Sequence, residues 1–367
     1  MKKFLYTLSV LLLIASPSLW AQKSGKSYVI GFYNLENLFD TYHDEGHNDY
    51  EYLPDGGNEW TEAKYTKKLQ NMAKVIAEMK NDNGAWHAVL GVSEVENRHV
   101  LDDLVNEPAI ADANYQIVHY DSPDRRGVDC ALFYRPEIFK YIASEPIPFT
   151  FDDNTSIDWS QWTQEEKDAF RTRDILMVRG TIDGEMFAFF VCHLPSRLGG
   201  KGADLRPRGA EIAYNRAMEL QKEFPGIKIV VMGDMNDNPT DISMTQYLHA
   251  DKDNIEDVKG DDEFFDPFLI MIKHGYSSLY YRGEGNIFDI VMVNKALAHA
   301  PKGTFQIQPI VKKKYYGRVF SKPFMTNQSG QYKGTPFRTF SGGAFVGGFS
   351  DHYPSRERSN GLCSPIE

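Results

Sequence analysis

Cysteine is scarce in this sequence of 367 residues, which contains only Cys130, Cys192 and Cys363. No two of them have the spacing of zinc ligands, so a cysteine-based zinc site is excluded. Cys130 and Cys192 each lie inside an apolar run, where a buried free thiol is the common outcome. A disulfide between these two, which an oxidising compartment would allow, is the alternative.

Long apolar runs are also scarce, and the longest, residues 4–15, lies at the N-terminus. Lys2 and Lys3 precede it and the segment SPSLWA, which ends at Ala21, follows it, as in an export signal. A membrane anchor is less well supported, because a span needs about 20 apolar residues. No cysteine follows the run to carry a lipid. We therefore expect residues 1–21 to be a signal peptide and the mature protein to be periplasmic or extracellular.

Positive charge is in deficit, with 40 Lys and Arg against 51 Asp and Glu and a net charge of −11. Loss of residues 1–21 would remove two lysines and no acid, and would bring the net charge to −13. Such a balance excludes a general nucleic-acid coat protein, which would be basic. It leaves room for a local basic cleft, and it suits a site that gathers divalent cations.

Repeats, low-complexity tracts and linkers rich in Pro, Gly or Ser are absent, so we expect one folded domain. An apolar stripe predicts a helix over residues 62–80, carried by Tyr65, Leu69, Met72, Ile76 and Met79. Residues 173–196 predict a β-hairpin that turns at Asp183 and Gly184. Residues 151–170 are acidic and without periodicity, which indicates an exposed excursion. Strands that alternate with both helices and hairpins favour mixed sheets covered by helices.

Polar residues recur where apolar strands end. In VVMGDMNDNP, Asp234 and Asn236 follow a buried-looking run and point the same way on an extended chain. Each such residue alone has an ordinary explanation, such as a turn, a helix cap or a satisfied core histidine. Eight of them in one domain predict an oxygen-rich site with two imidazoles, which suits Mg²⁺, Mn²⁺ or Ca²⁺ rather than zinc. The eight are Asn34, Glu94, His193, Asp234, Asn236, Asp289, Asp351 and His352.

The segments YNLENLFD, GVSEVENR, VCHLPSR, GDMNDNP, FDIVMV and SDHYP occur in this order along the chain. Over about residues 27–354 the sequence resembles the endonuclease/exonuclease/phosphatase superfamily, the deoxyribonuclease I-like proteins. HLPSRLGG and YKGTPFRTFSGGAFVGGFSDHYP resemble an exported bacterial branch of it. The resemblance implies an α+β fold, a four-layer α/β/β/α sandwich, with the site at one edge of the two sheets. Residues 22–354 would form this domain.

The resemblance also implies a role for each site residue. The metal shell would be Asn34, Glu94 and Asp351, holding Mg²⁺ or Mn²⁺, with Ca²⁺ as an alternative and one-metal and two-metal schemes both open. Asp234 would orient or deprotonate the attacking water, and Asn236 would help to hold it. The remaining roles are phosphate contact by His193 and acid–base work by His352, with Asp289 fixing its tautomer. Among nearby basic residues, Arg197 is the first candidate to bind the phosphate; a solvated loop is the alternative.

The end of the chain departs from the family pattern. SDHYP usually leads into a final apolar strand, whereas residues 355–367 read SRERSNGLCSPIE, which is polar and lacks strand alternation. We therefore predict a disordered tail over residues 355–367.

These features predict a metal-dependent phosphoesterase, first of all an endonuclease or other phosphodiesterase that acts as a monomer on nucleic acid. One alternative keeps the machinery and changes the substrate to inositol phosphates or sphingomyelin, as in a phosphatase or a phospholipase C. Another is a non-catalytic phosphate-binding surface protein, which the presence of every metal and histidine position disfavours.

Overall fold

The computed structural model describes residues 26–151, 155–197, 202–310 and 315–360. Of residues 358–360 it describes only the backbone. The predicted signal peptide lies outside the described residues. None of the described helices is long and apolar enough to cross a membrane.

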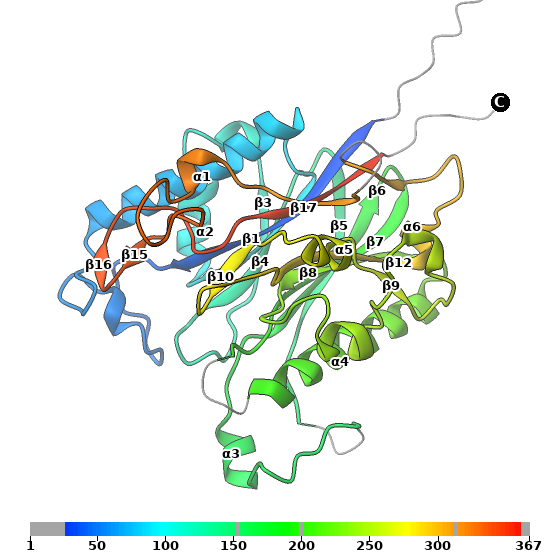
Figure 1. Cartoon of the computed structure of the whole chain (residues 1–367), viewed down its shortest axis with the longest axis horizontal. Coiled ribbons are helices and arrows are strands. Elements are labelled where there is room, and N and C mark those ends of the chain that lie inside the picture. The colour runs from blue at the N-terminus through cyan, green and yellow to red at the C-terminus, as the bar shows by residue number, and fades with distance from the viewer. Residues whose placement is uncertain (1–25, 152–154, 198–201, 311–314, 361–367) are drawn as a thin grey trace, which may run out of the picture.

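Two mixed sheets form the centre of the described chain (Figure 1). The first has the order β13 (Gln306–Gln308), β17 (Ser355–Asn360), β1 (Ser27–Leu38), β2 (Val89–Val95), β4 (Asp129–Tyr134) and β3 (Gln116–His119), and β14 (Gly317–Val319) also pairs with β17. The second has the order β5 (Phe139–Ile147), β6 (Ile175–Ile182), β7 (Glu185–His193), β8 (Lys228–Asp234), β12 (Asp289–Asn294) and β9 (Phe264–Phe265). In each sheet one central pair is parallel, β1 with β2 and β7 with β8.

Helices cover the outer faces of both sheets. The described helices are α1 (Glu62–Asn83), α2 (Arg98–Val105), α3 (Gln164–Ala169), α4 (Gly202–Glu223), α5 (Phe268–Lys273) and α6 (Lys295–Ala298). One buried cluster joins α1 and α2 to the first sheet, and a second joins the two sheets to each other and to α4. In Figure 1, α1 and α4 lie on opposite sides of the paired sheets. The predicted α+β fold with four layers is confirmed.

Local signals explain several boundaries. Helix α1 carries the predicted apolar stripe and ends at Gly84, whose φ of 75° suits a residue without a Cβ. Helix α2 begins at Asn97, whose side chain accepts a hydrogen bond from the Val100 amide. The β6–β7 hairpin turns at Asp183 and Gly184, both with positive φ, as predicted.

Close contact between the sheets depends on one glycine. A Cβ on Gly91 of β2 would lie 2.8 Å from the Met232 sulfur of β8, well inside van der Waals contact. A side chain at this position of β2 would therefore have to displace Met232 and Val191 of the second sheet.

The prediction of a disordered tail is wrong for residues 355–360. They form β17, which pairs antiparallel with β1 from Ser27↔Asn360 to Phe32↔Ser355 and also pairs with β13 and β14. In Figure 1 this red strand lies beside the blue β1. The ladder uses backbone groups, which every residue here supplies, and it covers an edge of β1 that would otherwise be unpaired. Residues 361–367 lie outside the described part of the chain.

Two further predictions can be compared with the structure. Cys130 and Cys192 are buried free thiols, as expected, and Cys363 lies outside the described residues. The described residues of the predicted excursion, 151 and 155–170, are mostly exposed, as expected, and Thr163 and Glu166 form a capping box at the start of α3. Aromatic rings in and next to this segment pack on one another, and they belong to Phe149, Phe151, Trp159, Trp162 and Phe170.

Two small hairpins and several short turns complete the described elements. The hairpins are β10 (Leu279–Tyr281) with β11 (Glu284–Asn286) and β15 (Phe340–Ser341) with β16 (Ala344–Phe345). Turns of 3₁₀ helix span Tyr50–Tyr52, Ala111–Ala113, Ile255–Asp257 and Pro323–Met325, and a π turn spans Ser243–Tyr247.

Candidate active site

The predicted residues converge at one edge of the sandwich. The parallel pairs β1–β2 and β7–β8 place the carboxyl ends of four strands there, and β12 begins at the same edge, with Asp289 opposite Asp234. His193 is the register partner of Asp234 on the other side. Because both sheets contribute residues, the site spans the interface between them.

Asn34 joins the two sheets at this edge. Its Nδ2 donates to Glu94 Oε1 at 3.2 Å and to Asp234 Oδ2 at 2.9 Å, and its Oδ1 accepts from the Glu36 amide at 2.9 Å. The Glu94 Oε2 accepts from the Asn37 amide at 3.0 Å. Asn34 is fully buried and lies inside β1 rather than at its end. Its amide therefore fixes the relative positions of two carboxylates from different sheets.

Backbone conformation at this edge is unusual. Of the nine described non-glycine residues with positive φ, four belong to the site: Glu36, Asn37, Glu94 and Asn236. Each such residue costs of the order of 1 kcal/mol and persists where its surroundings require it. At Asn236 the requirement is visible, because its amide N donates to Asp234 Oδ1 and its Nδ2 donates to the Leu194 carbonyl. The turn thus holds the Asp234 carboxylate in one orientation.

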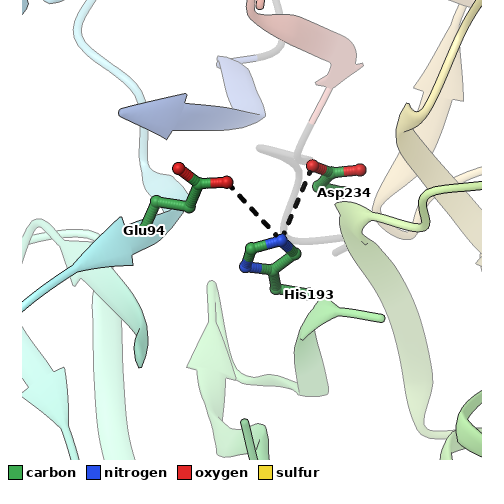
Figure 2. A group of neighbouring side chains, drawn as sticks. All are labelled: Glu94, His193 and Asp234. Atoms are coloured by element: carbon green, nitrogen blue, oxygen red, sulfur yellow. Dashed lines mark ion pairs between the residues drawn. The ribbon is translucent and has the colours of Figure 1, made fainter. Parts of the chain in front are cut away.

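Glu94, His193 and Asp234 form a cluster that could hold a metal ion (Figure 2). One ligand atom from each lies within 4.8 Å of the others. The His193 Nε2 is 3.6 Å from Glu94 Oε1 and 3.8 Å from Asp234 Oδ2. Burial, together with Arg173 and Arg126, lowers the pKa of His193 well below its usual value, which favours the neutral ring that a metal ion requires.

The donor set fits a divalent cation. Two carboxylates and one imidazole offer charge and hard oxygen atoms. Burial raises the pKa of Asp234 to about 7, although the positive charge of His352 opposes the shift. A cation beside this buried carboxylate would offset the unfavourable burial of its charge. Of the shell predicted from the resemblance, only Glu94 belongs to this cluster.

His352 and Asp289 form a buried pair next to Asp234. The His352 Nδ1 lies 2.8 Å from Asp289 Oδ2, which also accepts from the Ser278 hydroxyl at 2.6 Å. The His352 Nε2 lies 3.7 Å from Asp234 Oδ2. Burial alone would lower the pKa of His352, but the carboxylates of Asp289, Asp234 and Asp351 outweigh it and raise the pKa well above its usual value. A charged imidazolium therefore faces the Asp234 carboxylate.

Asp351 lies 3.9 Å from His352 Nε2 and also joins a second network, whose other members the sequence did not reveal. Its Oδ2 pairs with Arg338 at 3.1 Å, and Arg338 also bonds Glu36 at 2.9 Å. Glu36 lies 3.7 Å from the fully buried Lys68, whose Nζ also donates to the Thr339 hydroxyl and the Phe349 carbonyl. Burial lowers the pKa of Lys68 to about 8, although the Glu36 charge opposes this.

The guanidinium of Arg197 is already engaged, which does not support its predicted contact with phosphate. Its Nη2 bonds Asp237 at 3.1 Å and Asp241 at 2.6 Å, and its Nε donates to the Asn236 carbonyl. Arg197 therefore braces the turn after β8. Arg126 is more accessible, because its side chain is 46% exposed, although it lies 3.8 Å from Asp124 and donates to Asn37 at 3.3 Å.

Comparison with known proteins places this geometry in a family. The family model described as "Endonuclease/Exonuclease/phosphatase family" matches residues 29–356. No curated protein sequence matches the chain significantly.

Solved structures with a similar fold include D. rerio TDP2 complexed with a single strand DNA product, at 14% identity and a TM-score of 0.51, covering 91% of this chain and 99% of that one. An endonuclease/exonuclease/phosphatase family protein from Bacteroides thetaiotaomicron has 13% identity and a TM-score of 0.51, covering 93% and 100%. A mannosyl-6-phosphatase from Bacteroides thetaiotaomicron VPI-5482 has 15% identity and a TM-score of 0.50, covering 92% and 100%. At these identities the likeness shows the fold alone. Because the family model spans nearly all of the described chain, the protein belongs to the endonuclease/exonuclease/phosphatase family.

Proposed function

We propose that the protein is a metal-dependent phosphodiesterase that cleaves nucleic acid by in-line attack of water on a phosphodiester. Its family consists of hydrolases that act on phosphate esters and generally use divalent metals. The observation that carries the finer proposal is the pairing of a buried carboxylate, Asp234, with a buried imidazolium, His352, at 3.7 Å. One group can accept a proton while the other neutralises or protonates an oxygen.

Each residue has a task that follows from its contacts. Asp234, held by Asn34 and by the Asn236 amide, orients the attacking water and accepts its proton. His352 offers its Nε2 proton to a phosphate oxygen, while Asp289 on Nδ1 fixes the tautomer and favours the charged form. Asn236 keeps Asp234 oriented and borders the same space, and Arg126 supplies positive charge near His193.

Glu94, His193 and Asp234 would hold the metal ion, with Asn34 orienting both carboxylates. When bound, Mg²⁺ or Mn²⁺ would supply positive charge against the anionic phosphate and polarise its P–O bond. Asp351 lies 3.9 Å from His352 Nε2 and pairs with Arg338. Its negative charge helps to stabilise the charged form of His352.

The test is an activity panel on the purified protein. We expect hydrolysis of plasmid DNA or RNA with Mg²⁺ or Mn²⁺, its loss with EDTA and its return on adding the metal. Inositol phosphates, sphingomyelin and 4-nitrophenyl phosphate serve as alternative substrates. Hydrolysis of one of these without cleavage of any nucleic acid would replace the proposed substrate, and full activity in exhaustively chelated protein would remove the metal mechanism.

Export is a separate proposal. It rests on the signal-like residues 1–21 and on the likeness of two segments to an exported branch. Fractionation of cells that express the full chain, with N-terminal sequencing of the product, tests it. A cytoplasmic product that retains Met1 would contradict it.

A further inference from the structure

A cavity of about 730 Å³ adjoins the candidate active site at Asp351. The β10–β11 hairpin supplies Tyr280 and Arg282 to its wall, and the segment of residues 327–346 supplies Tyr332 and Lys333. A volume of this size is typical of sites for small molecules, whereas a continuous duplex needs an open groove. The cavity therefore indicates a compact group bound next to the reacting phosphate.

The charge of the cavity is opposite to that of the chain. Its lining contains Arg282, Lys333 and Arg338 but only one acid, Asp351, in a protein with a net charge of −11. Arg338 is paired with Asp351, whereas neither Arg282 nor Lys333 forms an ion pair within the described part of the chain. Two cations without carboxylate partners attract an anion into the cavity.

The cavity also offers exposed rings. Tyr280 and Tyr332 are 42% and 53% exposed, so their rings are accessible from the cavity. Phe337, Phe340 and Val346 add apolar surface to the same lining. Tyrosine rings stack on the faces of bases and sugars, and contribute specificity without adding charge.

We propose that this cavity binds a phosphorylated sugar ring of the substrate, whose second phosphate reacts between Asp234 and His352. The inference rests on the proposed function for the reaction and adds the substrate class: a compact molecule or chain end with two anionic groups. The ring stacks on Tyr280 or Tyr332, and its own phosphate pairs with Arg282 and Lys333. A nucleotide of a single strand and a free sugar bisphosphate share this chemistry.

Binding is measured by calorimetry with the full chain in EDTA, which removes the metal, so that the ligands are not consumed. We expect thymidine 3′,5′-bisphosphate to bind at least about 10-fold more tightly than thymidine 5′-phosphate, since a charge-assisted contact is worth a factor of this order. Arg282→Gln and Lys333→Gln should each remove most of that difference. Lys302→Gln, an exposed lysine in the loop after α6, is the matched control and should retain it.

Two more ligands distinguish the sources of the ring. Glucose 1,6-bisphosphate that binds more tightly than the nucleotide would identify a sugar bisphosphate as the source, and the reverse order would identify a nucleotide. A duplex that binds more tightly than a single strand of the same sequence would overturn the inference. So would equal affinities for the mono- and bisphosphate, or an advantage that survives in both Gln variants.

Kinetics separate this inference from the proposed function. The small diester methyl 4-nitrophenyl phosphate lacks a second anion, so its hydrolysis by the wild-type protein tests the proposed function independently of the cavity. A protein that hydrolyses no diester but binds the bisphosphate through Arg282 would refute the proposed function and support the cavity. A protein that hydrolyses the diester without preferring bisphosphates would do the opposite.

Discussion

Two buried polar groups that lie five residues apart, His352 and Glu357, have opposite surroundings. His352 has a carboxylate at each ring nitrogen, Asp289 at 2.8 Å and Asp234 at 3.7 Å. Glu357 is fully buried on β17 opposite Ile30, and neither of its oxygens has a hydrogen-bond partner among the described residues. Burial, and then the nearby Asp266, raises the pKa of Glu357 well above its usual value.

A buried polar group lowers stability unless neighbouring groups compensate for its loss of hydration, and a compensated group can take part in chemistry. Removing a charge or polar group from water is unfavourable in both places. At His352 the carboxylates offset that cost and leave an imidazolium aimed at Asp234. At Glu357 no group of the described chain forms a hydrogen bond or an ion pair that would offset it, so the buried acid is destabilising. Four experiments test this difference, in order of decreasing expected effect.

The largest effect is expected from removing residues 355–367. Although Glu357 is unfavourable, the backbone of β17 bridges β1, β13 and β14, and its loss would leave three unpaired edges. We expect the shortened chain to be insoluble or unfolded by circular dichroism. A soluble shortened protein with an unchanged melting temperature would show that β17 contributes little, and would restore the prediction of a loose tail.

Asp234→Asn should reduce kcat by about 10²-fold or more while the protein stays folded, because it removes the charge that orients and deprotonates water. His352→Asn should cause a comparable loss. The double variant should lose much less than the product of the two, since groups that act as a unit are not additive. Steady-state kinetics and thermal melts measure both properties.

A matched control lies elsewhere in the fold. His119 Nε2 is 3.0 Å from Asp129 Oδ2 and is buried like His352, but it lies outside the candidate site. His119→Asn should lower the melting temperature and leave kcat nearly unchanged. If the two histidine variants behave alike, His352 has a structural role only, and the proposal that it acts with Asp234 in the reaction fails.

Glu357→Leu should stabilise the protein by about 1–3 kcal/mol, the cost of an unsatisfied buried polar group. Because the pKa of Glu357 is raised in the folded state, wild-type stability should fall as the pH rises above the pKa of the unfolded glutamate, about 4.3. The advantage of Leu should therefore be larger at pH 8 than at pH 4, as measured by urea denaturation. An advantage that does not change with pH would mean that the carboxyl finds a partner on folding.

The smallest of the four effects concerns the metal. Glu94→Gln keeps the shape of the side chain and the contact with the Asn37 amide, but removes a charge from the cluster with His193 and Asp234. We expect the activating concentration of Mn²⁺ to rise by about 10-fold or more. An unchanged metal requirement in a folded variant would remove Glu94 from the ligand set.

Sequence patterns predicted the strand ends well but could not reveal their partners. Apolar runs bordered by Asn34, Glu94, Asp234 and Asp289 located the edge, because period and burial are local properties. Strand β17 could not be predicted from the sequence, because its ladder is made by backbone groups and its side chains are polar. The burial of Lys68 could not be predicted for another reason. It lies three residues after Tyr65 and four before Met72 on the apolar face of α1, where a single lysine in the sequence gives no sign of its partners. Only the tertiary fold brings Glu36, Thr339 and Phe349 to it.

The contact between Gly91 and Met232 gives the distance between the sheets a chemical meaning. Asn34 on one sheet holds Asp234 on the other at 2.9 Å, so in the proposed mechanism the separation of the sheets also sets the orientation of the attacking water. A methyl group at residue 91, three residues before Glu94 on β2, would press on Met232, which lies two residues before Asp234 on β8. Its effect would be seen in the reaction rate as well as in stability.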